Sequence, residues 1–234
     1  MSTPTTPSVV LYISMSLDGY ITTKDDDLGW LEMVNGTGED YGYFEMKSRM
    51  GSYIVGRKTY DVVRNLCNGE FPAANDFDCY IITRQSIPNK ENITFFNGDV
   101  ADLIKELKAK SDKDIYCDGG GEVVRLLMDQ NLIDEYIISI IPTILGDGKR
   151  LFLGEIGGIN IEAISTTKYN SGLIQVHYQR NLKPKTISND VRRSNDTIGK
   201  LRRSKHKKDV DKSRSQGALL WCESWRSEED LEKD

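Results

Sequence analysis

The sequence predicts an α/β fold whose central sheet is largely parallel. Short runs of apolar, β-forming residues, beginning with residues 9–14, are typical of strands that are buried on both faces. Segments with apolar residues at helical spacing alternate with these runs along the chain. Glycines follow several of the runs directly, as expected where a strand turns into a helix. This alternation is the pattern of repeated strand–helix–strand units.

The first helix is predicted over residues 39–50, where Tyr43, Met46 and Met50 recur at helical intervals. Acidic residues stand near its start, where they interact favourably with the helix dipole. An apolar run over residues 52–55 predicts a second buried strand. A glycine ends this strand, and the basic and hydroxyl residues after it begin another helix.

The middle of the chain repeats the pattern. Residues 78–83 and 93–96 are rich in β-forming residues and predict two more strands. Apolar residues on one face predict a helix over residues 100–109. A short strand at residues 115–117 then runs into three glycines, and an amphipathic helix follows over residues 123–128.

The last part of the domain is predicted to close the sheet with further strands. These strands lie at residues 133–141, around 151–152, at 159–165 and at 173–180. Residues 146–148 form a tight Gly-Asp-Gly turn between them. Because short turns join antiparallel strands, whereas parallel strands need a crossover, we expect the last strands to pair antiparallel.

Length and composition indicate one domain with additional terminal segments. The chain has 234 residues and 38% hydrophobic content, enough for one α/β domain of ordinary size. Apolar periodicity stops after residue 182, and a polar segment without it cannot offset the entropy of ordering. We therefore expect a flexible start at residues 1–8, a folded domain at residues 9–182, and a basic, disordered tail at residues 183–234.

The charge distribution argues against nucleic acid as the partner of the domain. The chain has a net charge of −5; acidic residues exceed basic ones before residue 182, and the reverse holds after it. An acidic body repels polyanions. The basic cluster at residues 200–208 leaves nucleic-acid binding or a localisation signal open as an alternative for the tail.

The sequence also lacks the signals of membrane insertion and of metal binding. No apolar run approaches the ~20 residues of a membrane span, and the start has no signal-peptide pattern. We expect a soluble, cytoplasmic protein. The four cysteines show no C-x-x-C spacing, and the two histidines lie far apart, which predicts isolated thiols, no disulfide framework and no metal site.

Two strand-to-helix turns have the composition of a phosphate site. The backbone of Gly119-Gly120-Gly121-Glu122 can approach a ligand closely, while free N–H groups at the helix start face an anion. Gly56-Arg57-Lys58-Thr59 adds two cations and a hydroxyl. Thr83-Arg84 ends a third strand. Ligands of open α/β sheets gather at the carboxyl ends of strands, so we expect these turns to lie together.

These turns belong to a longer set of stretches that resembles the dihydrofolate reductase superfamily. The closest branch contains the C-terminal reductase domain of the bifunctional riboflavin-biosynthesis deaminase-reductase. The resemblance implies a three-layer αβα fold with a mixed, mostly parallel sheet, here as a stand-alone member without the zinc-binding deaminase domain. The stretches that carry it are Val10 to Ile21, Val55 to Tyr60, Gly119 to Glu122, and Asp134 to Gly146.

The same resemblance implies NADPH as the cofactor. By this comparison, Arg57 holds the adenosine 2′-phosphate, Thr83 and Arg84 flank the adenosine, and the glycine triplet holds the pyrophosphate. Ser14 and Ile21 are similar to the positions that hold and pack the nicotinamide. The expected cofactor-binding residues are Ser14, Ile21, Gly56, Arg57, Lys58, Thr59, Thr83, Arg84, Gly119, Gly120, Gly121, Glu122 and Val123.

Three residues are candidates for the catalytic site. Trp30 matches the aromatic residue beside the substrate in folate reductases, although packing alone also explains a tryptophan there. Asp40 is similar to the carboxylate that these enzymes keep on the first helix, with a helix-start acid as the alternative. Asp18 is a rival acid, although Asp-Gly is also a common turn dipeptide.

Departures from the family pattern restrict the substrate. Residues 72–78 contain no basic residue, whereas folate reductases use an arginine before the third strand, so folate is not expected. Tyr12 stands where the riboflavin-pathway reductase has a lysine, and Lys47 and Arg49 are possible substitutes.

We therefore expect a reductase, commonly a homodimer in this family, that transfers a hydride to a C=N or C=O group. Its substrate would be pterin- or pyrimidine-like, with 5-amino-6-(5-phosphoribosylamino)uracil as one possibility. A non-catalytic NADPH-binding module of the same fold is the alternative.

Overall fold

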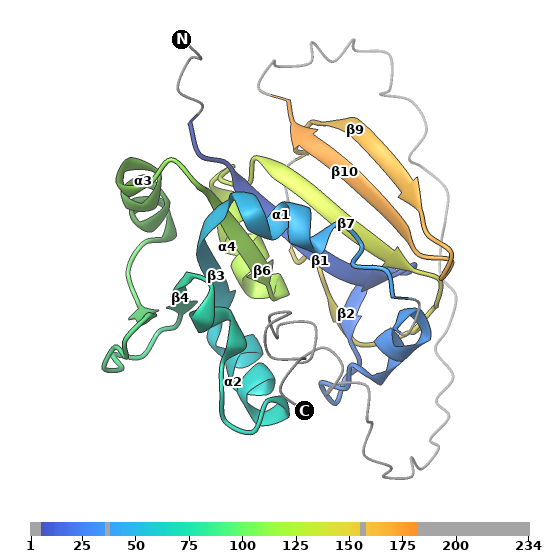
Figure 1. Ribbon diagram of the computed structural model, residues 1–234, viewed down its shortest axis with the longest axis horizontal. Coiled ribbons are helices and arrows are strands. Elements are labelled where there is room, and N and C mark those ends of the chain that lie inside the picture. Colours follow the sequence, from blue (N-terminus) through green and yellow to red (C-terminus); the bar gives the residue numbers. More distant parts are fainter. Residues whose placement is uncertain (1–5, 36–37, 155–157, 182–234) are drawn as a thin grey trace, which may run out of the picture.

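A central β-sheet organises the fold (Figure 1). The protein is seen in a computed structural model that describes residues 6–35, 38–154 and 158–181. Within these residues, eight strands form one sheet in the order β5-β4-β3-β6-β1-β7-β10-β9. The strands are β1 (Val9–Ser16), β3 (Met50–Gly56), β4 (Asp78–Ile82), β5 (Ile93–Phe96), β6 (Asp114–Gly119), β7 (Glu135–Ile141), β9 (Ile161–Lys168) and β10 (Ile174–Arg180).

The pairing of the strands is mixed, as the sequence predicts. Neighbours from β5 through β7 run parallel. Strand β10 pairs antiparallel with both β7 and β9, which confirms the expectation for the last strands. Two further strands, β2 (Tyr20–Thr22) and β8 (Lys149–Arg150), form a separate small ribbon.

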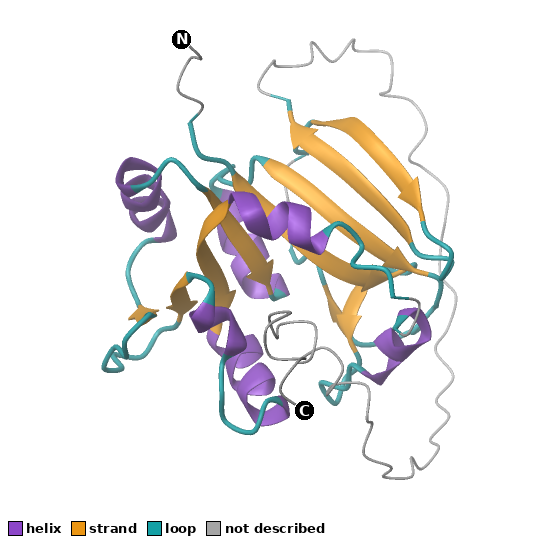
Figure 2. Cartoon of the chain, in the orientation of Figure 1, coloured by secondary structure: helices purple, strands orange, loops and turns teal. Residues whose placement is uncertain are grey.

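Helices cover both faces of the sheet (Figure 2). They are α1 (Tyr43–Arg49), α2 (Arg57–Leu66), α3 (Val100–Lys110) and α4 (Gly121–Asp129), with 3₁₀ turns at Gly29–Val34 and Pro72–Asn75. Successive side chains of a strand point to opposite faces, so Val9 and Leu11 join the cluster under α3 and α4, whereas Val10 joins the cluster under α1 and α2. The three-layer αβα prediction is therefore confirmed.

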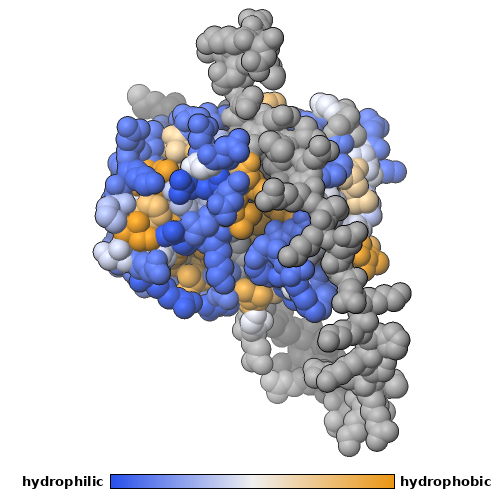
Figure 3. Space-filling model, turned by 90° about the horizontal axis from the view of Figure 1, so that it is seen from below, coloured by the Kyte–Doolittle hydropathy of each residue, from blue (hydrophilic) through white to orange (hydrophobic). Residues whose placement is uncertain are grey.

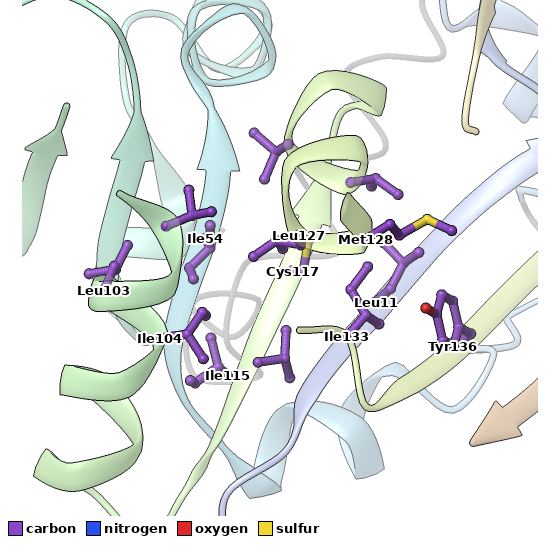
Figure 4. Packing of buried hydrophobic residues seen from close by; sticks show 14 of the residues in the cluster. Leu11, Ile54, Leu103, Ile104, Ile115, Cys117, Leu127, Met128, Ile133 and Tyr136 are labelled. Atoms are coloured by element: carbon purple, nitrogen blue, oxygen red, sulfur yellow. The ribbon is translucent and has the colours of Figure 1, made fainter. Parts of the chain in front are cut away.

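The cluster under α3 and α4 shows how apolar spacing becomes a core (Figure 4). Leu103 and Ile104 of α3 and Leu127 of α4 turn toward Leu11 and Ile115 in the sheet, and all five are buried. Removing such side chains from water is the main favourable contribution to folding, at about 1.5–3 kcal/mol for each large aliphatic residue. Both helices are thereby fixed against the sheet, and the start of α4 is placed at the end of β6.

Several predicted bounds differ from the structure by one to four residues, and one predicted strand is absent from the main sheet. Helix α1 begins at Tyr43 rather than at residue 39, because Gly42 has φ +79°, a left-handed conformation that does not continue a helix. Strand β7 begins at Glu135 rather than at residue 133. The strand expected around residues 151–152 is wrong: β8 lies just before it and pairs with β2, outside the main sheet.

The residue before β1 is tied to the neighbouring strand. Ser8 donates its N–H to Asp114 Oδ1, at the start of β6, at 2.7 Å. The predicted tail, residues 183–234, lies wholly outside the described residues. Cys79 and Cys117 are buried free thiols, as the prediction of isolated thiols has it for these two. None of the described helices is long and apolar enough to cross a membrane.

The start of α4 tolerates no side chain at Gly121. A Cβ there would lie 2.5 Å from the carbonyl oxygen of Arg150, which is backbone and cannot rotate away. We predict that Gly121→Ala lowers the free energy of unfolding by roughly 1–3 kcal/mol, as overpacking typically does, measured by urea denaturation. Gly158→Ala is the control, since nothing lies within 4 Å of its Cβ position. Equal stability of the two variants would contradict this packing.

Candidate functional site

A large cavity of about 1660 Å³ lies at the carboxyl ends of the parallel strands. The turns that follow β3, β4 and β6 all contribute to its lining. This is the position expected for a ligand of an open α/β sheet. Figure 3 views the protein from below, the side on which α2 and β2 lie in Figure 1, and there polar side chains surround smaller apolar areas.

The two predicted phosphate turns are in direct contact. The backbone N–H of Gly120 donates to Thr59 Oγ1 at 3.3 Å. Gly119 has φ +91°, which favours glycine. A Cβ at Gly56 would lie 3.1 Å from Val123 Cγ2, and a Cβ at Gly120 would lie 3.3 Å from Thr59 Oγ1. Both contacts are tight, so glycine at these positions lets the two turns pack closely. A side-chain cap is absent from α2 and α4 as described, so first-turn N–H groups face the cavity as potential anion donors.

Arg57 stands at the rim of the cavity with part of its guanidinium uncommitted. Its Nε donates to both carboxylate oxygens of Asp61 at 2.8 Å, and its guanidinium carbon lies 5.5 Å from the centre of the Phe95 ring. The ion pair and the ring hold the side chain in place. Its two terminal nitrogens make no hydrogen bond within the described residues, so they can bind a phosphate in the bidentate manner typical of arginine.

Nearly all the predicted cofactor residues line this cavity. The structure brings together Ser14, Ile21, Gly56, Arg57, Lys58, Thr59, Thr83, Arg84, Gly120, Gly121, Glu122 and Val123. The exception is Gly119, which does not line the cavity; its Cβ position faces the Ile13 side chain at 3.1 Å. Gly119 thus contributes to the site through its backbone conformation and not by lining the cavity.

The predicted catalytic residues are more scattered. Trp30 packs with Val34, Ile141 and Leu173 and lines neither this cavity nor the second one described below. Its indole nitrogen is buried without a hydrogen-bond partner among the described residues. Asp40 lines the second cavity.

The carboxylates of Asp40 and Asp18 both accept hydrogen bonds from backbone N–H groups. The carboxylate of Asp40 accepts the N–H groups of Gly42 and Phe44 at 3.1 and 3.2 Å, and so caps α1. Asp18 lines neither cavity. Its carboxylate accepts from the Ser16 hydroxyl at 2.6 Å and from the Gly146 N–H at 2.7 Å, and these bonds lower its pKa, the Ser16 bond most of all. Asp18 thereby anchors the turn at Gly146.

A second cavity, of about 340 Å³, adjoins the first. The two share Ile13, Ser14, Leu31 and Asp118 in their linings. Ser14, predicted at the nicotinamide, therefore lies at the border between the large cavity and the small one. Two ligands, one in each cavity, would come into contact near Ser14.

Asp118 is the acidic side chain that borders both cavities, and the sequence analysis missed it. It is only 5% exposed. The Tyr116 hydroxyl donates to its Oδ1 at 3.0 Å, and the Tyr53 hydroxyl donates to its Oδ2. Burial raises the pKa of Asp118 to about 6, although the two tyrosine hydroxyls favour the ionised form. Its position directly before the glycine triplet, at a strand end, is the signal that could have identified it.

The basic residues suggested as substrate partners are engaged elsewhere. Lys47 forms an ion pair with Asp76 at 2.8 Å, and Arg49 pairs with Glu135 at 2.6 Å. Neither Lys47 nor Arg49 lines either of the two cavities. Tyr12, in contrast, lines the second cavity, with its hydroxyl donating to the Tyr41 carbonyl at 3.1 Å. The suggestion that Lys47 and Arg49 replace the missing lysine is therefore wrong.

The sheet order and the position of the site define a class of protein. Dihydrofolate reductase from Enterococcus faecalis, solved in complex with NADP(H) and RAB-propyl, aligns with a TM-score of 0.55 at 15% identity. The alignment covers 74% of this chain and 96% of the reductase. The chain thus has a dihydrofolate reductase-like fold.

Comparison of sequences gives the family. The RibD C-terminal domain family matches residues 7–175. YwjB of Bacillus subtilis (strain 168) is 36% identical over 172 residues, which cover 73% of this chain and 97% of YwjB. A protein of known structure from Shewanella sp. PV-4 is 27% identical with a TM-score of 0.68, covering 74% of this chain and 99% of that one. The chain belongs to the RibD C-terminal domain family.

The raised pKa of Asp118 predicts a pH-dependent contribution to stability. A carboxyl whose pKa rises from 3.8 to about 6 on folding binds a proton in the native state that the unfolded chain releases. Its stabilising contribution is complete below the unfolded pKa and is lost as pH rises through about 6. We predict that the stability of the native protein relative to Asp118→Asn falls by up to about 3 kcal/mol between about pH 4 and pH 7.

Urea denaturation across this pH range measures the difference. Glu106→Gln, which alters an exposed acid on α3, is the control and is expected to stay parallel to the native protein. Parallel curves for Asp118→Asn would contradict the prediction.

Proposed function

We propose that this chain is a cytoplasmic, NADPH-dependent reductase that transfers a hydride to a C=N or C=O group of a small pterin- or pyrimidine-like compound. The observation that carries the proposal is the contact between the two phosphate turns, Gly120 N–H to Thr59 Oγ1, at the edge of the large cavity. Membership of the RibD C-terminal domain family supports a reductase of this kind.

The residues of the large cavity fit a phosphorylated dinucleotide. Uncapped helix starts and close-packed glycines suit the pyrophosphate, and the free nitrogens of Arg57 suit a phosphate monoester. Lys58, Thr59, Thr83 and Arg84 would contact the remaining phosphate and adenosine groups. Bound there, NADPH would supply the hydride. The related fold of the Enterococcus reductase holds NADP(H), which agrees with this assignment.

We propose Asp118 as the group that holds the proton. A carboxyl with a pKa of about 6 is partly protonated near neutral pH. It can donate its proton to a substrate and then be reprotonated by solvent. Its position between the two cavities gives it access to a substrate in the small one. Asp40 remains a second candidate because it lines the small cavity, while Trp30 and Asp18 stay predictions that rest on the family resemblance.

Arg57 is predicted to select NADPH over NADH. Arg57→Ala removes the terminal nitrogens and leaves the Asp61 carboxylate unpaired beside the phosphate, so we expect NADPH to bind roughly ten- to hundredfold more weakly and NADH to bind nearly unchanged. Calorimetric titration with each nucleotide measures both. Arg64→Ala is the matched control on the same helix, since Arg64 bonds the Gly69 carbonyl and lines neither cavity. An unaltered preference in Arg57→Ala would count against the assignment.

The alternative, a module that binds NADPH without turning it over, predicts binding but no oxidation with any pterin, pyrimidine or quinone substrate. The buried carboxyl of Asp118 at the border of the two cavities favours the enzyme, because acids with a raised pKa are concentrated at catalytic sites.

We also propose that the chain forms a homodimer. Strand β9 is an edge of the sheet, and Ile161, Ile164 and Ile174 are 41%, 53% and 41% exposed on β9 and β10. An apolar sheet edge is a surface on which proteins associate. Light scattering should give twice the 26.5 kDa of one chain, and Ile164→Lys should reduce it to one. A native monomer would contradict the proposal.

A further inference from the structure

Asp118 stands at an irregularity in the pairing of β3 with β6. The register passes from Cys117 directly to Gly119, so Asp118 is skipped in the pairing with β3. An extra residue of this kind re-aims the side chains of a strand, and such bulges are common next to active sites. The carboxylate of Asp118 is accordingly turned toward two tyrosine hydroxyls and is shielded from solvent.

The two tyrosines that reach Asp118 are fixed by their own packing. Tyr53 and Tyr116 are register partners on β3 and β6, and their rings meet edge to face with centroids 4.9 Å apart. Phe77 stacks on the Tyr53 ring at 6.0 Å, and Phe71 meets that ring edge to face at 5.8 Å. Tyr53 is 1% exposed and Tyr116 is 2% exposed. Close packing of buried rings thus holds both hydroxyls against the carboxylate.

The two carboxylate oxygens of Asp118 have different surroundings. The Tyr116 hydroxyl donates to Oδ1 at 3.0 Å, and Tyr116 lines the small cavity. The Tyr53 hydroxyl donates to Oδ2, and Tyr53 lines neither cavity. Oδ1 is therefore the oxygen on the side of the small cavity, whereas Oδ2 is on the side of the aromatic core.

Both tyrosines act on Asp118 as hydrogen-bond donors and not as bases. Burial raises the pKa of Tyr53 and of Tyr116 well above the usual value, and the charge of Asp118 raises it further. Burial and then this same charge also raise the pKa of Tyr43, which faces Asp118 from α1. No lysine, arginine or histidine of the described chain contributes to the pKa of Asp118. The two hydroxyl bonds are thus what favours the ionised carboxylate.

We propose that Tyr53 and Tyr116 are positioning residues that hold the Asp118 carboxyl in one orientation, with its exchangeable proton on Oδ1 and with Oδ2 kept as the carbonyl oxygen. In the transfer the Oδ1–H bond breaks, its electron pair stays on the carboxylate, and the proton joins the nitrogen or oxygen of the reduced group. Each carboxylate oxygen then already has a donor in place. The inference rests on the proposed role of Asp118 and assigns the geometry of that role.

Infrared spectroscopy of the full-length protein tests which oxygen carries the proton. The carbonyl stretch of protonated Asp118 is assigned by its loss in Asp118→Asn. A hydrogen bond accepted by a carbonyl oxygen weakens the C=O bond and lowers this frequency. Tyr53→Phe, which removes one oxygen and keeps the ring, should therefore raise the frequency, while Tyr116→Phe should leave it nearly unchanged. Tyr136→Phe is the control, because Tyr136 is a buried tyrosine of β7 that lines neither cavity.

The same spectra, taken across a range of pH, give the midpoint at which Asp118 ionises. Tyr53→Phe and Tyr116→Phe each remove one bond to the ionised form. Each should raise the midpoint by about one pH unit, a tenfold change in the acid dissociation constant. Tyr136→Phe should leave it in place. If the two tyrosines only packed the core, the folded variants would keep the native band and the native midpoint.

An unshifted band in Tyr53→Phe, or midpoints that stay in place in both variants, would overturn the inference. A band that shifts in Tyr116→Phe instead would also overturn it, because the proton would then lie on Oδ2. Neither measurement requires turnover, which separates the inference from the proposed function. If the midpoint rises in Tyr53→Phe but the pH dependence of NADPH oxidation does not follow it to higher pH, the role of Asp118 as proton donor fails while its positioning by the tyrosines stands.

Discussion

The pairing of β3 with β6 is the constraint on which the site depends. In their parallel register Val55 lies beside Gly119, so the turns that follow the two strands leave the sheet at the same level. The absence of side chains at Gly56 and at the glycine triplet then allows the starts of α2 and α4 to touch through Gly120 and Thr59. Two helix starts that each attract an anion weakly thus lie side by side at the edge of the large cavity.

Two neighbouring cavities meet at one buried acid. Basic and acidic side chains both line the large cavity, while carboxylates and tyrosines line the small one. Asp118 lies at the border, in the low-dielectric interior, where it accepts hydrogen bonds from two tyrosine hydroxyls. The burial that raises its pKa is therefore set by residues of both cavities.

Local patterns in the sequence predicted most of the fold, and the turns expected to bind a cofactor all contribute to one cavity. The strand at residues 93–96 and the glycine triplet were recognised from residue types over a few positions, and the parallel sheet then brings the strand ends together. The residues expected to be catalytic are less closely grouped. Asp40 was expected as an acid but caps α1, and the role of a carboxylate depends on which backbone groups happen to face it. The pairing of β2 with β8 was not predicted, because a strand of two residues is too short to show the alternation of apolar and polar residues that identifies strands.

The sequence by itself determined the alternation of strands and helices, the turns rich in glycine and basic residues, and the resemblance to dihydrofolate reductase-like proteins, because these depend on residue spacing of a few positions. The tertiary structure alone decided the burial of Asp118, the engagement of Lys47 and Arg49 by distant acids, and the acidic character of the small cavity. Such properties arise from residues far apart in the chain. A pKa or an unpaired polar atom is set by the surroundings in space, which spacing along the sequence does not encode.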